Sequence, residues 1–454
     1  MALIELDLTA RPDAEPTSLP PAHRYRLAGL LAAAVLVIAL GGAAPAVPWL
    51  WRQLGTVSAP GLETPFELAG NRLFTFVEAG AERVATAWQI ETAPRHLWTA
   101  RFPVRVAGPN DVAFGGVHAT PAGDVVLLSD GPATTVVDAR TGELRWTAPV
   151  PVTPLPGGRI GVTESQHFRA GTVYDQNSGR PGPLYFSATG EPHTEPPTRT
   201  DVRGVELATG RTLWSVPARG SVNVEVAPGD EAAVLILSAD RLERRDGDDG
   251  ALLRQVPVPR TRQDGDAGGE LVSGELVGGR VLTHYGFLDG IEVAYAPDTL
   301  RELWTRRMPR IMLDVPKCVD VLCYGDRKAL DVLDPATGRA LWRGADDVDL
   351  AQRAGYVLET TEAGAPRRLA DPRTGATRVD LAAWRGEVLG DPDEPIVLRH
   401  QPSRTVNEFG VVRPGRDTVQ PLGVVQDRLF DCVAGERYVV CRVDGGLRIW
   451  AYRS

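Results

Sequence analysis

Cysteine and methionine are scarce in this sequence, with four and three copies among 454 residues, and aromatic residues make up only 6%. So few cysteines exclude a small disulfide-rich scaffold. No adjacent Cys-Cys pair, Cys-x-x-Cys-His haem motif, P-loop or Gly-x-Ser-x-Gly elbow occurs. Charges of both signs are interspersed and sum to −9, which argues against a nucleic-acid-binding surface. The sequence therefore lacks the motifs of the common catalytic classes.

The sequence also contains no characteristic spacing of metal-binding residues. The seven histidines show no spacing such as His-x-x-x-His, so surface or hydrogen-bonded core positions explain them better than a zinc site. Glycine and proline, in contrast, are frequent, with 48 and 37 copies. A protein of many short strands joined by tight turns needs this composition.

The N-terminus has the pattern of a membrane anchor. Residues 1–26 are polar and predict a disordered tail. An uncharged stretch then runs from Leu27 to Trp51 and exceeds the roughly 20 residues that cross a bilayer. Arg24 and Arg26 precede it and only Arg52 follows closely, so the positive-inside rule places the tail in the cytoplasm. We expect a single plasma-membrane span at 27–51, with Trp49 and Trp51 at the interface, and an extracytoplasmic remainder.

A cleaved signal peptide is the alternative interpretation of this stretch. Its strongly apolar core, Leu27 to Leu40, is short, and Ala44-Pro45-Ala46 has the small-x-small form of a cleavage site. Both interpretations export the rest of the chain.

A repeated unit, Asp-x-x-Thr-Gly-x-x-x-Trp, dominates the remainder. It is complete from Asp138 through Gly142 to Trp146 and from Asp334 through Gly338 to Trp342. A third copy, with Gly210 and Trp214, begins with Glu206 in place of Asp. The weaker copies follow the same frame: Asp246 to Gly250 with Arg254, Pro297-Asp298-Thr299 before Trp304, and Asp371 to Gly375 with Val379.

Each unit predicts a β-hairpin with a buried aromatic residue. An apolar strand runs into Asp138, whose carboxylate can accept hydrogen bonds from the turn backbone. Gly142 supplies the positive φ that such a turn requires, and the second strand then carries Trp146. Six of the ten tryptophans stand at or near such a hairpin position: Trp98, Trp146, Trp214, Trp304, Trp342 and Trp450.

The spacing of these units predicts an all-β propeller. Most units are 31 to 50 residues apart and contain about four strand-like runs, which is the pattern of propeller blades. We expect eight four-stranded blades over residues 66–454, with seven as the alternative, after a linker at 52–65. The ring should close between N-terminal and C-terminal strands, because closure removes exposed strand edges. The Pro- and Thr-rich segment 187–203 predicts a long loop inserted in one blade.

The cysteines predict two local disulfides, because export places them in an oxidising compartment. The pairs are Cys318 with Cys323 and Cys432 with Cys441. Residues five apart on a strand lie about 16 Å from each other, so the first pair can bond only if the chain turns between them. Four buried free thiols are the alternative.

The repeat units at 138–146, 206–214 and 334–342 resemble those of the PQQ-like (quinoprotein dehydrogenase-like) β-propeller family, and the likeness extends over residues 60–454. With its tail and single apolar stretch, the chain looks like the membrane-anchored actinobacterial type. The resemblance implies a propeller, and it covers both quinone-dependent alcohol dehydrogenases and non-enzymatic scaffolds. The dehydrogenases require a calcium-held quinone and a vicinal cysteine pair, and no such pair occurs here.

The sequence therefore favours a non-catalytic extracytoplasmic scaffold without a cofactor or metal. Its expected partner is a protein, peptide or cell-envelope component, bound at the loop-rich faces or in the central channel. The alternative is a membrane-bound oxidoreductase that depends on PQQ or another ligand. An exported sensor is a third hypothesis, which would need a membrane partner because the tail is too short for a signalling domain.

Overall fold

A computed structural model describes residues 51–453 except 60, 62, 105–115, 176, 178, 180–181, 183, 228–231, 258, 260–271, 286–287, 311–317 and 327–328. The expected cytoplasmic tail and nearly all of the expected membrane span lie outside the described residues. Within the described part of the chain, no helix is both long and apolar enough to span a membrane.

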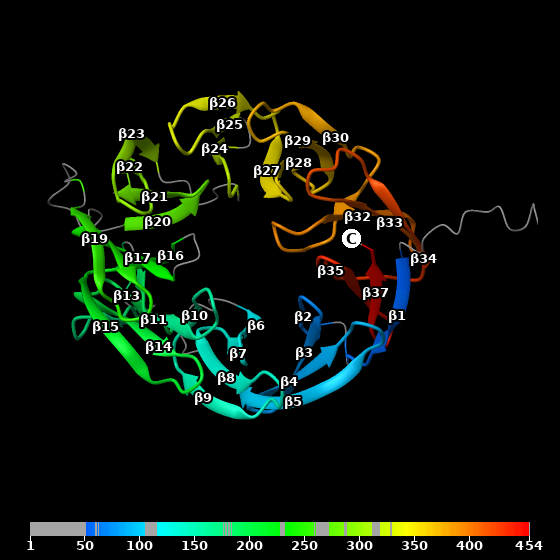
Figure 1. Cartoon of the computed structure of the whole chain (residues 1–454), viewed down its shortest axis with the longest axis horizontal. Helices are drawn as coiled ribbons and strands as arrows, with labels where there is room; N and C mark the ends of the chain where they lie inside the picture. The colour runs from blue at the N-terminus through cyan, green and yellow to red at the C-terminus, as the bar shows by residue number, and fades with distance from the viewer. Residues whose placement is uncertain are drawn as a thin grey trace, which may run out of the picture. The chain divides into compact units, whose positions relative to one another are not determined.

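In the described residues, eight four-stranded sheets and one three-stranded sheet stand around a common centre (Figure 1). We number these sheets as blades in the order in which their innermost described strands follow along the chain. Blades 1 to 3 contain β2 (Phe66–Ala69), β3 (Arg72–Ala79), β4 (Glu82–Gln89), β5 (Arg95–Pro103); β6 (Val117–Ala122), β7 (Val125–Asp130), β8 (Ala133–Asp138), β9 (Leu144–Ala148); and β10 (Thr153–Pro154), β11 (Ile160–His167), β14 (Arg199–Glu206), β15 (Thr212–Arg219).

Blades 4 to 6 contain β16 (Val222–Val226), β17 (Ala233–Ser238), β18 (Arg241–Asp246), β19 (Leu252–Pro257); β20 (Val272–Val277), β21 (Arg280–Tyr285), β22 (Leu288–Tyr295), β23 (Glu302–Arg310); and β24 (Leu322–Asp326), β25 (Ala329–Leu333), β26 (Ala340–Arg343). Blades 7 and 8 contain β27 (Val348–Arg353), β28 (Tyr356–Thr361), β29 (Pro366–Ala370), β30 (Thr377–Asp380); and β31 (Gly386–Glu387), β32 (Ile396–Ser403), β33 (Val406–Val412), β34 (Gln420–Gln426).

Blade 9 closes the ring with strands from both ends of the described chain. Its three inner strands are β35 (Cys432–Ala434), β36 (Tyr438–Val443) and β37 (Gly446–Tyr452), and its outermost strand is β1 (Trp51–Val57). β1 pairs antiparallel with β37, with Trp51 opposite Tyr452 and Val57 opposite Leu447. The predicted closure between N-terminal and C-terminal strands is confirmed.

The expected number of blades, eight or seven, is wrong, because the described strands form nine. That expectation assumed that the hairpin with Trp450 completes the first blade. The hairpin instead belongs to blade 9, and β1 supplies the fourth strand of that blade.

The expected linker at 52–65 instead begins with strand β1, so the propeller starts at Trp51 and not at residue 66. Trp51, expected at a membrane interface, stacks on Phe409 and Trp450 at centroid distances of 5.2 and 5.5 Å. Trp450 itself lies on the third strand of its blade, whereas the other five hairpin tryptophans lie on outermost strands.

The ring has two distinct faces because the strands of each blade alternate in direction. The links between first and second strands and between third and fourth strands lie on one side, which we call the turn face. The links between second and third strands and those between blades lie on the other, the insert face. The insert face carries the described part of the link between β11 and β14, including the small hairpin of β12 (Tyr185–Phe186) and β13 (Pro192–His193).

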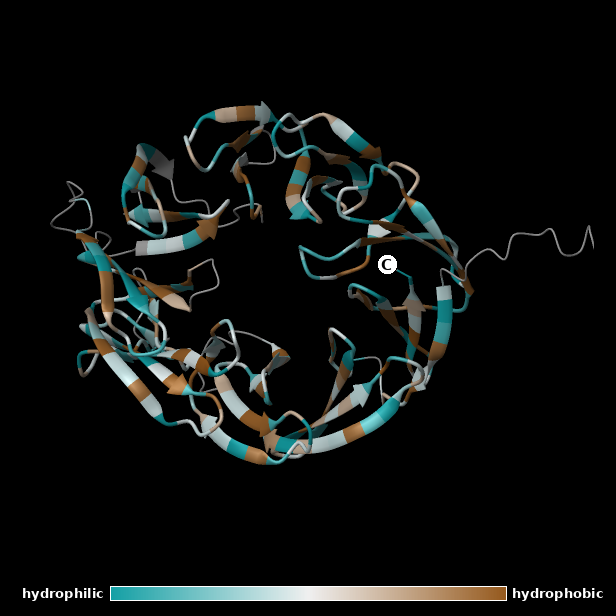
Figure 2. Ribbon diagram, in the orientation of Figure 1, coloured by the Kyte–Doolittle hydropathy of each residue, from teal (hydrophilic) through white to brown (hydrophobic). Residues whose placement is uncertain are grey.

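The hydrophobic core lies between neighbouring blades and not in one common centre. One cluster joins Phe74 and Trp98 of blade 1 to Val126 and Leu128 of blade 2, and similar clusters join each following pair up to blades 7 and 8. Blade 9 packs on blade 1 through Ile449 and its neighbours. Hydrophobic residues accordingly follow the strands, while the connecting turns are mostly hydrophilic (Figure 2).

Candidate functional site

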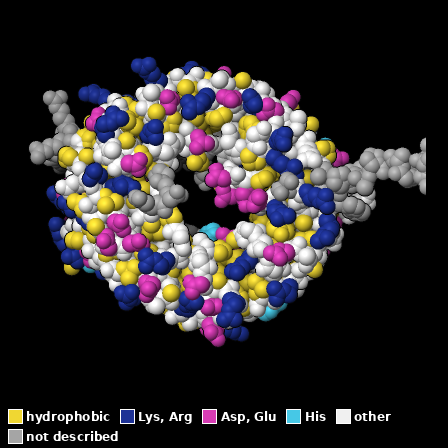
Figure 3. Space-filling model, viewed as in Figure 1, with side chains coloured by type: hydrophobic (Ala, Val, Ile, Leu, Met, Phe, Trp, Pro, Cys, Tyr) yellow, Lys and Arg dark blue, Asp and Glu magenta, His cyan; other side chains and the backbone are white. Residues whose placement is uncertain are grey.

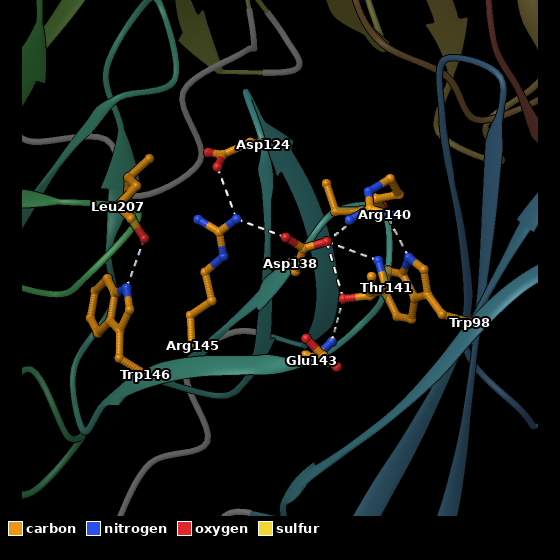
Figure 4. A network of polar contacts seen from close by, with 10 residues as sticks. Trp98, Asp124, Asp138, Arg140, Thr141, Glu143, Arg145, Trp146 and Leu207 are labelled. Atoms are coloured by element: carbon orange, nitrogen blue, oxygen red, sulfur yellow. Dashed lines mark hydrogen bonds and ion pairs between the residues drawn. The ribbon is translucent and has the colours of Figure 1, made fainter.

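The turn of the repeat is held by its first residue, as the sequence predicts. The Asp138 carboxylate accepts hydrogen bonds from the backbone N–H groups of Arg140 and Thr141 at 2.9 and 2.8 Å and from Arg145 at 2.7 Å (Figure 4). These contacts, with Arg145 foremost, hold the pKa of Asp138 well below its ordinary value. Asp371 makes the same backbone contacts with Arg373 and Thr374. The repeat aspartates therefore act as structural acceptors in turns.

The repeat tryptophan connects neighbouring blades, which the hairpin interpretation missed. The indole N–H of Trp98 in blade 1 donates to the carbonyl of Ala139 in blade 2 at 3.0 Å (Figure 4). Its ring covers Gly142, where an added Cβ would lie 2.8 Å from the indole. A glycine is thus required at position 142 for two reasons, its φ of 73° and the close approach of the Trp98 indole ring.

This docking of a tryptophan on the next blade occurs at five seams of the described ring. The indole donates to the carbonyl after the repeat's first residue: Trp98 to Ala139, Trp146 to Leu207, Trp214 to Gly247, Trp304 to Pro335 and Trp342 to Pro372. The ring covers the turn glycine in each case: Gly142, Gly210, Gly250, Gly338 and Gly375. The repeat thus encodes the joint between blades as well as the hairpin.

The seam between blades 4 and 5 follows the same frame with different residues. Arg254 stands where the other blades have tryptophan, and it is exposed. Leu300 stands where the next turn has glycine, with a positive φ of 53°. Its side chain is buried in the cluster that joins these two blades. A side chain fits at this turn because no indole covers it.

The predicted disulfides are confirmed. Cys318 bonds to Cys323, with their Cα atoms 5.9 Å apart across a bend, so the chain turns between them as required. Cys432 bonds to Cys441, its direct neighbour across β35 and β36, at a Cα distance of 4.1 Å. The first disulfide fixes the link into β24, and the second joins two inner strands of blade 9.

Carboxylates on the innermost strands form the candidate binding site. Space-filling atoms leave an opening at the centre of the ring, with acidic side chains around part of it (Figure 3). The innermost strands of the eight four-stranded blades carry five carboxylates and one arginine; the carboxylates are Glu67, Glu225, Glu275, Asp349 and Glu387. The arginine, Arg353, is neutralised by an ion pair of 2.6 Å with Glu387.

The carboxylates of blades 3, 4 and 5 repel one another. Burial, and then the charge of Glu225, raise the pKa of Glu164 on β11 to about 7. Burial and the charge of Glu275 raise the pKa of Glu225. Glu275 in turn lies 3.8 Å from the imidazole of His284. A cation between these blades would relieve the repulsion.

A loop in blade 8 extends toward the centre of the ring between β31 and β32 (Figure 1). It contains Asp391, Asp393 and Glu394, and Leu389 is 68% exposed. The loop is held from both sides: Ala354 of blade 7 donates its N–H to Pro392, and Ala434 of blade 9 donates to Leu389. The loop therefore offers acidic and apolar contacts from a fixed backbone.

None of these inner-strand residues was predicted from the sequence. The repeat residues that were predicted (Asp138, Gly142, Trp146, Gly210, Trp214, Trp304, Asp334, Gly338, Trp342) lie on the turn face and the outermost strands. A signal was nevertheless present, because Glu67, Glu225, Glu275 and Glu387 are each followed by Leu or Val within a short apolar run. The charge in these runs marks the strand that reaches the centre.

The described residues do not fit a calcium-held quinone. Among them, no group of three or more His, Cys, Asp or Glu side chains could hold a metal ion. The two disulfides join residues five and nine positions apart, so neither is the vicinal pair of the alcohol-oxidising quinoproteins.

Comparisons with solved structures give likenesses of low identity. BamB from Moraxella catarrhalis is 12% identical, with a TM-score of 0.40 over 89% of this chain and 98% of that one. The computationally designed Ika8 protein is 15% identical, with a TM-score of 0.41 over 75% and 97%. A europium-containing methanol dehydrogenase is 11% identical, with a TM-score of 0.39 over 77% and 84%.

No curated protein sequence matches the chain. A family model described as outer membrane protein assembly factor BamB matches residues 49–216 and 96–342. Together these matches span residues 49–342, which is well over half of the chain and includes all three of the best repeat units. The chain therefore belongs to the BamB family of PQQ-like repeat propellers.

Proposed function

We propose that this protein is a membrane-anchored extracytoplasmic scaffold that binds a protein partner and catalyses no reaction. The observation that carries the proposal is the set of carboxylates on the inner strands, with Arg353 already paired. Such a surface attracts a cationic segment of a partner, because opposite charges steer and hold an encounter. Family membership supports the scaffold role, since the family is described by an assembly factor.

The proposed location of the propeller is outside the cytoplasm, held by a single membrane span. The uncharged stretch from Leu27 to Trp51 supports a single span, and Arg24 and Arg26 before it support a cytoplasmic tail. Both disulfides support an oxidising compartment for the propeller. Protease added to intact cells should degrade the propeller and spare an N-terminal epitope tag. Protection of the propeller would contradict the proposed location.

Binding of a cationic segment can be measured on the full chain in lipid nanodiscs. The probe is fluorescent nona-arginine, with nona-glutamate as the control peptide. We expect the variant Glu225→Gln/Glu275→Gln to bind nona-arginine at least about fivefold more weakly, and binding to weaken as salt rises. The matched control, Glu143→Gln/Glu302→Gln, removes two exposed charges from outer positions and should bind like the parent. Equal affinities in all three proteins would contradict the channel as the binding site.

The oxidoreductase alternative makes a different prediction. Saturable binding of PQQ in the presence of calcium would overturn the proposal of a non-catalytic scaffold. Crosslinking in intact envelopes, followed by purification of the tagged chain, would then identify the physiological partner in either case.

A further inference from the structure

The inner strand of blade 3 is too short to cover the strand beside it. β11 (Ile160–His167) pairs along its whole length with β14 on its outer side. On its inner side, β10 pairs only with Gly161 and Val162. No other described strand pairs with β11. The inner edge of residues 163–167, which we call the open edge, therefore has no strand beside it in the described part of the chain.

The link that precedes β10 is tied to blade 2 and cannot extend the pairing. The Thr134 hydroxyl of blade 2 accepts a hydrogen bond from the N–H of Val152 at 3.2 Å and donates one to the carbonyl of Val150 at 3.1 Å. If the register of β10 continued, Pro151 would stand opposite Glu164, and a proline has no N–H to donate. The chain thus prevents its own link from covering the open edge.

The open edge presents the backbone groups of Glu164 and Gln166. In an antiparallel strand, every second residue turns its N–H and C=O groups to the same side. Ile160 accepts the N–H of Leu155 from the inner side, and Val162 pairs with β10 on that side. The same alternation turns the N–H and C=O groups of Glu164 and Gln166 inward.

The open edge is flanked by protein, unlike the ends of other long second strands. β3 and β32 also run past their inner strands. Their last residues are exposed, Glu78 and Ala79 in one and Pro402 and Ser403 in the other. Residues 163–167, in contrast, are all half-buried. The open edge is therefore a position within the ring and not a free hairpin tip.

The side of the open edge toward blade 4 is acidic. Glu164 points the same way as Val162, whose hydrophobic cluster includes Ile236 of blade 4. The charge of Glu225 on β16 of blade 4 acts on Glu164. Neither of these two carboxylates is paired with a cationic side chain of the described residues.

The opposite side of the open edge is already neutralised. Asp201 on β14 lies 3.1 Å from the guanidinium of Arg199 and 2.9 Å from the imidazole of His167. Unpaired negative charge therefore lies on one side of the open edge only. Side chains alternate between the two sides of a strand, so this charge suits a strand with a cationic residue at every second position.

We propose that a partner protein inserts an extended cationic segment into the ring as the missing inner strand of blade 3, paired with the open edge. This proposal rests on the proposed function and specifies the segment that binds. The backbone groups of Glu164 and Gln166 hold the segment by strand addition. The carboxylates of Glu164 and Glu225 receive its lysine or arginine side chains.

Two peptides test whether the backbone of the segment takes part in binding. One is a fluorescent peptide of about nine residues that alternates Lys and Val. The other has the same sequence with a methyl group on every backbone nitrogen, so it keeps the charges but donates no backbone hydrogen bonds. We expect the full chain in lipid nanodiscs to bind the methylated peptide at least about tenfold more weakly, as measured by fluorescence anisotropy. Equal affinities would overturn strand addition.

A proline variant tests the location of the added strand. Gln166→Pro removes an inward N–H and spares the pairing with β14, because that N–H faces away from β14. The matched control, Ser215→Pro, removes an outward N–H from the outermost strand of the same blade, where Pro217 already has this position two residues further on. We expect Gln166→Pro to bind the unmethylated peptide at least about tenfold more weakly and Ser215→Pro to bind it like the parent. Parental affinity in Gln166→Pro would contradict the location.

Hydrogen exchange gives an independent measurement, because Gln166→Pro also loses the side chain that accepts a hydrogen bond from Ala188. In the parent protein, the amides of Glu164 and Gln166 should exchange freely. The unmethylated peptide should slow their exchange at least about tenfold. Slow exchange already in the free protein would show that the chain itself covers the open edge, and would overturn the proposal.

The nona-arginine measurement separates this proposal from the proposed function. A chain that binds nona-arginine through Glu225 and Glu275, but binds both Lys-Val peptides equally, retains the cationic site and refutes only strand addition. A chain that binds none of these peptides refutes both.

Discussion

At the residue scale, the turn glycines are constrained by a neighbouring blade as well as by their own backbone. Gly210 and Gly364 have nearly the same φ, 74° and 77°. They differ in what a side chain would meet, because a Cβ on Gly210 would lie 2.6 Å from Trp146, whereas nothing lies within 4 Å of Gly364. The two positions therefore separate the cost of the backbone conformation from the cost of the clash.

We expect Gly364→Ala to reduce the free energy of unfolding by about 1 kcal/mol, through the positive φ alone. Gly210→Ala should cost about 3 kcal/mol, because the indole must move as well. Thermal unfolding of both variants measures the difference. Equal losses would show that the docked tryptophan contributes little to the seam.

A second residue-scale prediction concerns Glu164, whose pKa is raised to about 7 by burial and by Glu225. In the unfolded chain this carboxyl has an ordinary pKa near 4.5. The folded state therefore holds the proton more tightly. The contribution of Glu164 to the free energy of unfolding is thus largest below pH 4.5 and falls until about pH 7. The loss above pH 7 is at most about 3 kcal/mol.

Glu164→Gln should accordingly raise the melting temperature at pH 8 by several degrees and leave it nearly unchanged at pH 4.5. The exposed Glu143→Gln serves as the control and should change neither value. A gain of the same size at both pH values would show that the ionisation of Glu164 does not cause it.

At the element scale, the joint between blades was only partly predictable from the sequence. Trp146 and Gly142 were identified because one hairpin contains both of them at a fixed spacing. Their true contacts are with blades 3 and 1, and sequence spacing within one unit contains no information about the neighbouring unit. Leu300 shows most clearly that the turn residue depends on the neighbouring blade. It replaces a turn glycine only where Arg254 replaces the docking tryptophan.

The seam between blades 4 and 5 should therefore accept the standard joint if both residues change together. Leu300→Gly alone should destabilise the fold by about 2–4 kcal/mol through a cavity. Arg254→Trp alone should destabilise it because the indole meets Leu300. The double variant should recover at least about 1 kcal/mol relative to the sum of the two losses, measured by a double-mutant cycle of unfolding free energies. Additive losses would contradict the docking rule.

At the scale of the whole molecule, the sequence predicted a closed propeller with mostly four-stranded blades, but eight or seven of them instead of nine. The error came from assigning the hairpin with Trp450 to the first blade. That hairpin forms a ninth blade with β1, whose first residue is the end of an uncharged stretch typical of a membrane anchor. The inner carboxylates were missed for a related reason. Glu67, Glu225 and Glu275 belong to distant parts of the sequence and approach one centre only after the ring closes.

Strand β1 should consequently be essential to the ring. A chain that begins at Trp51 should be monomeric, whereas one that begins at Phe66 lacks the outermost strand of blade 9. The shorter chain exposes the edge of β37 and should aggregate or melt at least about 10 °C lower, because an unpaired edge recruits other strands. Size-exclusion chromatography and thermal unfolding compare the two. Equal behaviour would show that β1 is dispensable for closure.

The antiparallel pairing of β1 with β37 also determines how the ring resists mechanical force. If the proposed membrane anchor holds the chain, tension enters at Trp51 and runs along β1, from Trp51 opposite Tyr452 to Val57 opposite Leu447. The hydrogen bonds of this ladder are then loaded in shear, so they share the load and do not open one after another. A pull that would peel a terminal hairpin apart is thus distributed over the whole length of the closing strand.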